Sequence, residues 1–153
     1  MLLATLAVLV LQTPSLARSA DAKSALATAN AVIAAINAGD GKALSALGFP
    51  EATVQSITVN SDGTTTRRSR TLADDAASLA SLQESGPIRE RIFDPVVTAD
   101  AGVATVVAPY DFWIKGALSH CGIDTFTFVK VDGVWKVAAL VYSKQTTGCP
   151  PRK

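Results

Sequence analysis

The side chains best suited to catalysis or binding lie between residues 108 and 126, APYDFWIKGALSHCGIDTF. This stretch holds the only histidine of the chain, His120, together with Asp111 and Asp124. A carboxylate beside an imidazole fixes its tautomer and raises its basicity, which suits general acid–base catalysis. Such a pair on a half-buried strand is more often structural. The stretch therefore predicts either a catalytic site or a satisfied polar pair.

The N-terminal sequence MLLATLAVLVLQTPSLA is typical of a secretory signal. Its apolar run, from Leu2 to Leu11, is too short to span a bilayer and is followed by small residues. We expect a signal peptide over residues 1–17, with cleavage after Ala17 or as late as Ala22, and a periplasmic or secreted protein without a membrane anchor. No Lys or Arg precedes the run, so a buried arm of a cytosolic protein is the alternative.

The chain has two cysteines, Cys121 and Cys149. In an oxidising compartment an even pair predicts a disulfide, which here would join the C-terminal tail to a strand. Closing this loop would stabilise the fold by about 3 kcal/mol. A metal site needs three or four clustered ligands, and one histidine without a CxxC motif does not supply them. We expect neither a metal nor another cofactor.

Helices are expected mainly in the first half of the chain. Apolar residues recur at helical spacing over residues 21–38, and Gly39 follows as a stop. A short helix is expected over residues 40–47. Thr71 and Asp74 form a capping-box pattern that predicts a third helix to about residue 83.

Strands are expected around and after these helices. Residues 52–60 are rich in β-branched side chains and predict a first strand, followed by a polar turn region over residues 61–70. Glycine turns, above all Asp132-Gly133, separate four further strands, expected over residues 88–98, 103–114, 118–131 and 134–142. This order predicts one α+β domain with helices on one face of a curved antiparallel sheet. The 14 basic and 13 acidic residues do not favour a nucleic-acid partner.

Three motifs then point to a family: RERIFDP, TVVAPYDFWIKGALSHCGIDTF and DGVWKVAALVYS. With them, residues 22–149 resemble the NTF2-like, or SnoaL-like, superfamily, in particular its exported bacterial proteins of unknown function. The resemblance implies a cystatin-like cone, in which three helices close a strongly curved sheet around an apolar pocket, and pairing of domains through the sheet as a homodimer. Its members include ketosteroid isomerases, dehydratases, polyketide cyclases and non-catalytic binding modules.

The resemblance does not extend to the catalytic residues of ketosteroid isomerases. Those enzymes use a tyrosine on the first helix and an aspartate on the first strand. The corresponding positions here hold Val32 and Ser56, and neither can perform those roles. Isomerisation by that mechanism is therefore not expected.

The hairpin turns predict which side chains face the pocket. With Asp132-Gly133 as a two-residue loop, one face carries His120, Asp124, Phe126, Phe128, Trp135, Val137, Ala139 and Val141. With Lys115-Gly116 as the loop of the preceding hairpin, Asp111 lies opposite His120 on the same face. A bulge at Pro109 would turn Tyr110 inward instead.

We therefore expect the domain to bind a small, largely apolar molecule. Asp124, with Asp111 and His120, would orient it, and the pocket wall would comprise Tyr110, Trp113, Phe126, Phe128 and Trp135. One alternative is a cofactor-free lyase, cyclase or isomerase with His120 as base and Asp111 as its partner. Another is a dimeric structural or interaction module. A set of arginines could form an anion site, although solvated strand faces are the simpler interpretation: Arg67, Arg68, Arg70, Arg89 and Arg91.

Overall fold

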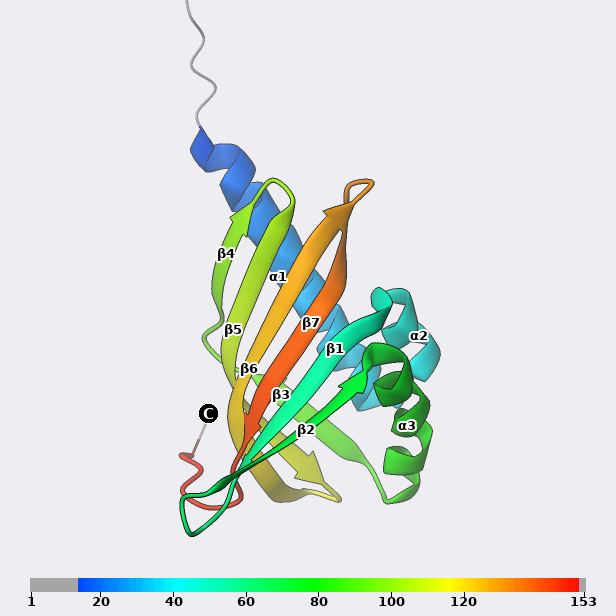
Figure 1. Ribbon diagram of the computed structural model, residues 1–153, viewed down its shortest axis with the longest axis vertical. Coiled ribbons are helices and arrows are strands. Elements are labelled where there is room, and N and C mark those ends of the chain that lie inside the picture. The colour runs from blue at the N-terminus through cyan, green and yellow to red at the C-terminus, as the bar shows by residue number, and fades with distance from the viewer. Residues whose placement is uncertain (1–13, 152–153) are drawn as a thin grey trace, which may run out of the picture.

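A computed structural model describes residues 14–151, with side chains described from residue 18 onward (Figure 1). The helices are α1 (Pro14–Ala38), α2 (Gly41–Ala46) and α3 (Leu72–Glu84). The strands are β1 (Gly48–Val59), β2 (Thr65–Thr71), β3 (Ile88–Ile92), β4 (Val96–Asp100), β5 (Val103–Ile114), β6 (Ala117–Val131) and β7 (Val134–Lys144). They form one sheet in the order β2-β1-β7-β6-β5-β3, with β4 also paired to β5. This is the expected α+β class with a curved sheet covered by helices.

Helix α1 lies along one face of the sheet (Figure 1). Its buried residues recur every three or four positions, as in Ala25, Ala29, Val32 and Ile36, so one stripe of the helix packs on the sheet. The expected helix over residues 21–38 is confirmed, and it begins earlier. Most of the expected signal peptide, residues 1–13, lies outside the described residues.

The two shorter helices begin at the expected caps. The Asp40 side chain accepts a hydrogen bond of 2.8 Å from the backbone N–H of Ala43 at the start of α2. Thr71 and Asp74 exchange side-chain and backbone hydrogen bonds in a complete capping box at the start of α3. Both caps satisfy N–H groups that have no partner within the helix, and both predictions are confirmed.

The sheet differs from expectation at its two edges. The segment expected to be a polar turn forms strand β2, which pairs with β1, and β1 in turn lies parallel to β7. An exposed edge strand with basic side chains lacks an apolar face, so its sequence does not show the alternation that predicts a strand. The strand expected over residues 88–98 is two strands, because Asp94 has a φ of 42° and Pro95 follows it.

Two bulges set the inward faces of β6 and β7. Trp113 faces Leu118 as expected, but Phe112 faces His120, so Ser119 is an extra residue on β6. On β7 the extra residue is Ala138, because Phe128 faces Val137 and Thr127 faces Ala139. Beyond a bulge, alternation continues on the other face.

The bulge on β7 corrects part of the expected inward face. Val137 faces Phe128 as expected, but Phe126 faces Leu140 and Asp124 faces Tyr142. Leu140 and Tyr142 therefore hold the inward places expected for Ala139 and Val141.

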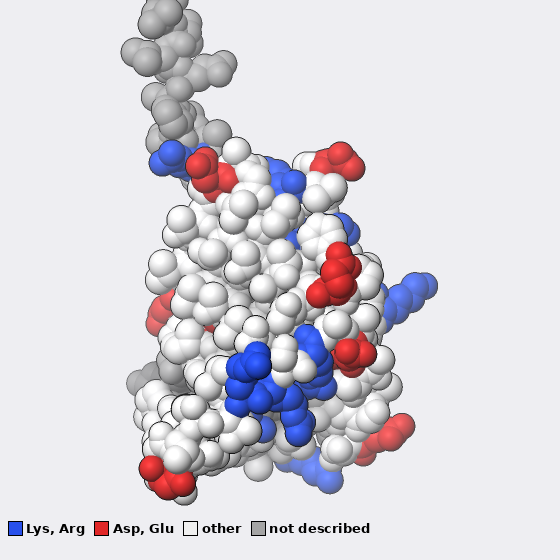
Figure 2. Space-filling view, in the orientation of Figure 1, with Lys and Arg blue, Asp and Glu red and all other residues white. Residues whose placement is uncertain are grey.

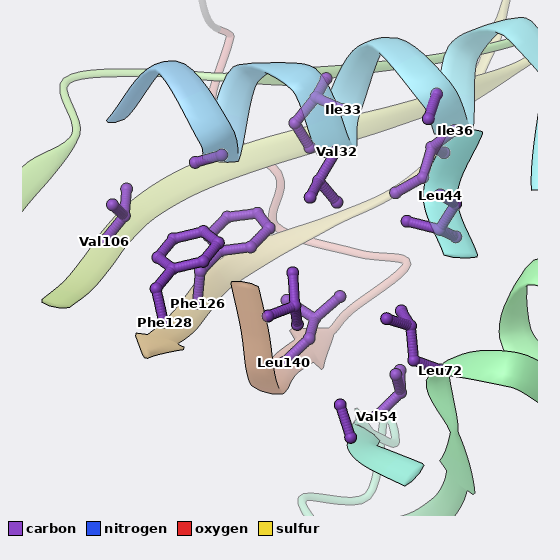
Figure 3. Packing of buried hydrophobic residues seen from close by; sticks show 14 of the residues in the cluster. Val32, Ile33, Ile36, Leu44, Val54, Leu72, Val106, Phe126, Phe128 and Leu140 are labelled. Carbon is purple, nitrogen blue, oxygen red and sulfur yellow. The ribbon is translucent and has the colours of Figure 1, made fainter. Parts of the chain in front are cut away.

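The core lies between α1 and the middle of the sheet (Figure 3). The Phe126 and Phe128 rings lie nearly parallel, with centroids 6.0 Å apart, close to Val32 of α1. Trp135 is also buried, and its Nε1 donates a 2.8 Å hydrogen bond to Ser24 Oγ. Burial of each of these aromatic side chains contributes about 1.5–3 kcal/mol.

The C-terminal tail is tied to β6 by a disulfide between Cys121 and Cys149, whose Cα atoms are 5.8 Å apart. Two backbone hydrogen bonds between Cys121 and Gln145, of 3.0 and 2.9 Å, hold the same region. The expected disulfide is confirmed. Within residues 14–151, no helix combines the length and apolar character needed to cross a bilayer.

Candidate functional site

A cavity of about 220 Å³ opens between the helices and the inward face of the sheet. Its apolar lining comprises Ile36, Leu79, Leu82, Phe112, Ile114 and Leu140. Its polar lining comprises Arg70, Asp75, Ser78, Glu90, Tyr110, Ser119, His120, Asp124, Tyr142 and Lys144. The site is therefore more polar than the apolar pocket that the family resemblance implies.

Glu90 and Asp124 form a carboxyl pair on the cavity wall. Their side chains are hydrogen-bonded to each other, and the two residues are 8% and 2% exposed. Asn37 of α1 fixes the Glu90 backbone, since its Nδ2 donates to the Glu90 carbonyl (2.9 Å) and its Oδ1 accepts from the Glu90 N–H (2.5 Å). Asp124 Oδ2 is buried without a hydrogen-bond partner among the described residues.

Burial raises the pKa of both carboxyl groups. The pKa of Glu90 rises to about 7, although its hydrogen bond with Asp124 opposes the increase. Burial and the neighbouring Glu90 also raise the pKa of Asp124 well above its usual range. Two such groups in contact cannot readily carry two negative charges. Below a pH of about 7 the pair therefore holds two protons. One lies in the hydrogen bond between the two groups, and the other can be donated into the cavity.

His120 lines the same cavity and lies on β6, four positions before Asp124. Its ring stacks on Phe112, with centroids 4.8 Å apart, and meets the Tyr110 ring edge-on at 5.8 Å. Burial, together with the positive charge of Lys144, lowers the pKa of His120 to about 4. The imidazole is neutral at pH 7 and is a weak base there, contrary to the raised basicity expected from a carboxylate partner.

The expected pairing of Asp111 with His120 is wrong. Asp111 faces Cys121 across the hairpin, and its carboxylate accepts two hydrogen bonds from the Arg91 guanidinium, of 3.0 and 2.5 Å. The extra residue at Ser119 shifts the register so that Phe112 faces His120. Tyr110 does turn inward, as the alternative register allowed, but the bulge is at Ser119 rather than at Pro109.

Two tyrosines complete the polar wall. The Tyr110 hydroxyl donates a 2.8 Å hydrogen bond to the Ser143 carbonyl, and burial raises its pKa far above the usual value. Tyr142 is hydrogen-bonded to Ser56 and Arg70. Both phenols therefore remain neutral and anchored.

Of the residues expected to bind a ligand, Tyr110 and Asp124 line the cavity, and His120 does so as well. Phe126, Phe128 and Trp135 belong to the packed core instead. Trp113 lines a separate groove with Arg89 and Arg91.

Sequence reasoning missed Glu90 and Tyr142. An available signal for Glu90 was its place between Ile88 and Ile92 in IRERI, where period-two alternation puts an acidic side chain on an apolar face. In the described part of the chain, no three His, Cys, Asp or Glu side chains are grouped so that they could hold a metal ion.

Comparison with known proteins places this geometry within a common architecture. No family model and no curated protein matches the sequence. The structure is similar to a protein of unknown function from Mycobacterium tuberculosis, with a TM-score of 0.71 and 16% identity over 88% of this chain and 77% of that one. It is also similar to a putative dehydratase of the NTF2-like family from Streptomyces avermitilis (TM-score 0.61, 17% identity, 82% and 96% coverage).

A third similar structure extends the range of chemistry associated with this shape. It is the β subunit of a putative aromatic-ring-hydroxylating dioxygenase from Novosphingobium aromaticivorans, with a TM-score of 0.67 and 12% identity over 84% of this chain and 91% of that one. Proteins with such different roles share the architecture and not one reaction. At these identities the likeness concerns the fold: the chain has the NTF2-like, or cystatin-like, fold.

Proposed function

We propose that this protein binds a small molecule with an apolar body, and that the protonated Glu90–Asp124 pair donates a hydrogen bond to an oxygen of that molecule. The observation that carries the proposal concerns Asp124, a cavity-lining residue that is 2% exposed and whose Oδ2 has no hydrogen-bond partner among the described residues. Buried polar atoms are normally satisfied. A bound carbonyl or hydroxyl oxygen would satisfy this one.

The shape and lining of the cavity support a small ligand. Its volume of about 220 Å³ is below the range of sites for drug-sized molecules. Leu79, Phe112 and Leu140 offer apolar contacts next to the carboxyl pair. A molecule with a single ring and a carbonyl group matches this combination.

Isothermal titration calorimetry with acetophenone and ethylbenzene tests the proposal. The two probes have similar shape, and only acetophenone can accept a hydrogen bond. We expect acetophenone to bind about tenfold more tightly, and this preference to vanish in Asp124→Leu. Asp100→Asn, at an exposed aspartate on β4, is the matched control. Equal affinity of the wild-type protein for both probes would refute the proposal.

The pKa of Glu90 supports catalysis as a second candidate function. A carboxyl group that titrates at about 7 suits proton transfer at neutral pH better than His120 does. A cofactor-free lyase, cyclase or isomerase would then use the Glu90–Asp124 pair, and not His120 with Asp111. Exchange of the acetophenone methyl protons in deuterated water, followed by NMR, would reveal such transfer. If the protein is a catalyst, the wild type must exchange these protons faster than buffer alone does, and Glu90→Gln must reduce the rate to that of buffer.

The outer face of the sheet supports self-association. Val107, Thr125 and Val141 form one row across β5, β6 and β7, and both valines are exposed. Figure 2 views this side of the molecule, where a broad area over these strands carries few charged side chains. We propose a homodimer through this face. Sedimentation should show a dimer that Thr125→Arg dissociates and Thr65→Arg, at an exposed edge position, does not. A wild-type monomer would exclude it.

The N-terminal contacts and the disulfide support export with cleavage after Ala17. Asp21 forms an ion pair with Lys130, and cleavage after Ala22 would remove this contact. Cleavage after Ala17 retains it. The intact mass of protein recovered from the periplasm or medium would distinguish the two sites, and recovery of the uncleaved chain in the cytoplasm would argue against export.

A further inference from the structure

Two cationic side chains line the cavity together with the carboxyl pair. Lys144 follows Leu140 and Tyr142 along the inward face of β7, and Arg70 comes from the edge strand β2. The cavity therefore has a basic side in addition to its acidic and apolar walls.

The two cations differ in how far they are neutralised. Arg70 is paired with Asp75 at 3.1 Å, and its other terminal nitrogen lies 3.4 Å from Ser78 Oγ. Among the described side chains, no carboxylate lies within 4.0 Å of Lys144. The charge of Lys144 nevertheless acts on groups inside the cavity, since it contributes to the lowered pKa of His120. Lys144 is thus a half-buried cation on the cavity wall without an anionic partner.

The carboxyl pair, whose Asp124 lies on the strand next to that of Lys144, does not neutralise this charge under mildly acidic conditions. Burial keeps Glu90 protonated below a pH of about 7, and it also raises the pKa of Asp124. At pH 6 the carboxyl pair is therefore largely uncharged, whereas a free carboxylic acid in solution is ionised. A carboxylate ligand with a second oxygen would meet both an ammonium group without an anionic partner among the described side chains and a hydrogen-bond donor on the neighbouring strand.

We infer that the ligand is a small organic anion, an oxo-carboxylate whose carboxylate contacts Lys144 while its carbonyl oxygen accepts from the Glu90–Asp124 pair. The apolar body of the ligand packs against Phe112, Leu79 and Leu140. This inference rests on the proposed binding function and extends it, because that function requires only the carbonyl oxygen and the apolar body.

Calorimetry at pH 6 and low salt with two closely matched ketones tests the inference. The probes are 3-benzoylpropanoate and its neutral amide, which share the ring, the ketone and the chain length. We expect the carboxylate to bind about tenfold more tightly than the amide, because a charge-assisted hydrogen bond replaces a neutral one. This preference should weaken as salt is added.

Lys144→Met should abolish the preference for the carboxylate while preserving binding of the amide. Lys42→Met, at an exposed lysine on α2, is the matched control and should leave the preference intact. A preference that survives in Lys144→Met would overturn the inference.

A further pair of probes separates this inference from the function on which it rests. If the wild-type protein binds the carboxylate and the amide equally, the inference fails. The binding function then still stands, provided that the amide binds more tightly than 4-phenylbutanamide, which lacks the ketone. If the protein binds neither ketone, both the inference and the binding function fail.

Discussion

The carboxyl groups of Glu90 and Asp124 share a hydrogen bond inside the cone, although each would be ionised at neutral pH in water. They come from β3 and β6, strands that do not pair with each other, because β5 lies between them in the sheet. The contact therefore depends on the curvature of the sheet, which brings inward side chains of separated strands together. This pair is the basis of the first prediction.

The carboxyl pair should make stability depend on pH. Burial raises the pKa of Glu90 from 4.5 to about 7, so folding takes up a proton and stability falls as the pH rises between these values. Replacing Glu90 with Gln removes this loss. We expect the stability of Glu90→Gln relative to wild type to grow with pH across this window, by up to about 1.4 kcal/mol per pH unit. Urea denaturation at several pH values measures it.

The comparison must be made as a difference because His120 acts in the opposite direction. The pKa of His120 is lowered from 6.5 to about 4, so its contribution to stability increases as the pH rises between these values. Both proteins contain His120, and its effect largely cancels in the difference. Glu51→Gln, at an exposed position on β1, should show no such trend. A constant difference between Glu90→Gln and wild type would contradict the raised pKa.

His120 should remain neutral well below the pH at which a free histidine becomes protonated. It is the only histidine of the chain, so its ring protons give a single set of NMR signals. We expect these signals to be unchanged from pH 8 to 5.5 and to titrate with a midpoint of about 4. The protein unfolded in urea serves as the reference and should titrate near 6.5. A midpoint near 6.5 in the folded protein would show that the ring is solvated.

Gly122 should tolerate no side chain. A Cβ atom at this position would lie 2.0 Å from the Ser143 carbonyl oxygen, the atom that accepts the Tyr110 hydrogen bond. We expect Gly122→Ala to destabilise the protein by about 1–3 kcal/mol, since the backbone of β7 must move. Gly102→Ala is the control, because nothing lies within 4 Å of its added Cβ. Similar unfolding midpoints for the two variants would rule out the close approach of β7.

The disulfide should contribute substantially to stability. Cys121 and Cys149 are 28 residues apart, and closing a loop of this length stabilises the folded state by about 3–4 kcal/mol in the chain-entropy model. We expect Cys149→Ser to lose this amount in urea denaturation. Reductant should destabilise the wild-type protein to the same extent and leave the variant unchanged. A wild-type protein that reductant does not affect would indicate that the two thiols are free.

The central elements of the fold could be predicted because their signals are local. The Thr71–Asp74 capping box, the Asp40 cap and the Asp132-Gly133 turn each involve residues close in sequence. Strand β2 could not be predicted in this way, because its side chains are polar on both faces and show no alternation of apolar and polar residues. Its structure depends on pairing with β1, which the sequence of the segment does not encode.

The candidate site was predictable only in part. His120 and Asp124 were assigned to the inward face, since alternation counted from the Asp132-Gly133 turn holds along β6. The pairing of Asp111 with His120 failed at a single bulged residue, Ser119. The alternation in IRERI could have placed Glu90 on the inward face, but its contact with Asp124, 34 positions further along the chain, has no local pattern.

The extra residue at Ser119 has a consequence for how this protein can change during evolution. Ser119 has no partner on β5, so deleting it would leave Phe112 opposite His120 and Trp113 opposite Leu118 while removing the bulge. Strand β6 can therefore lose one residue at this point without changing which β5 residue faces the imidazole. The stacked pair of Phe112 and His120 would persist in a protein with a regular β5–β6 hairpin.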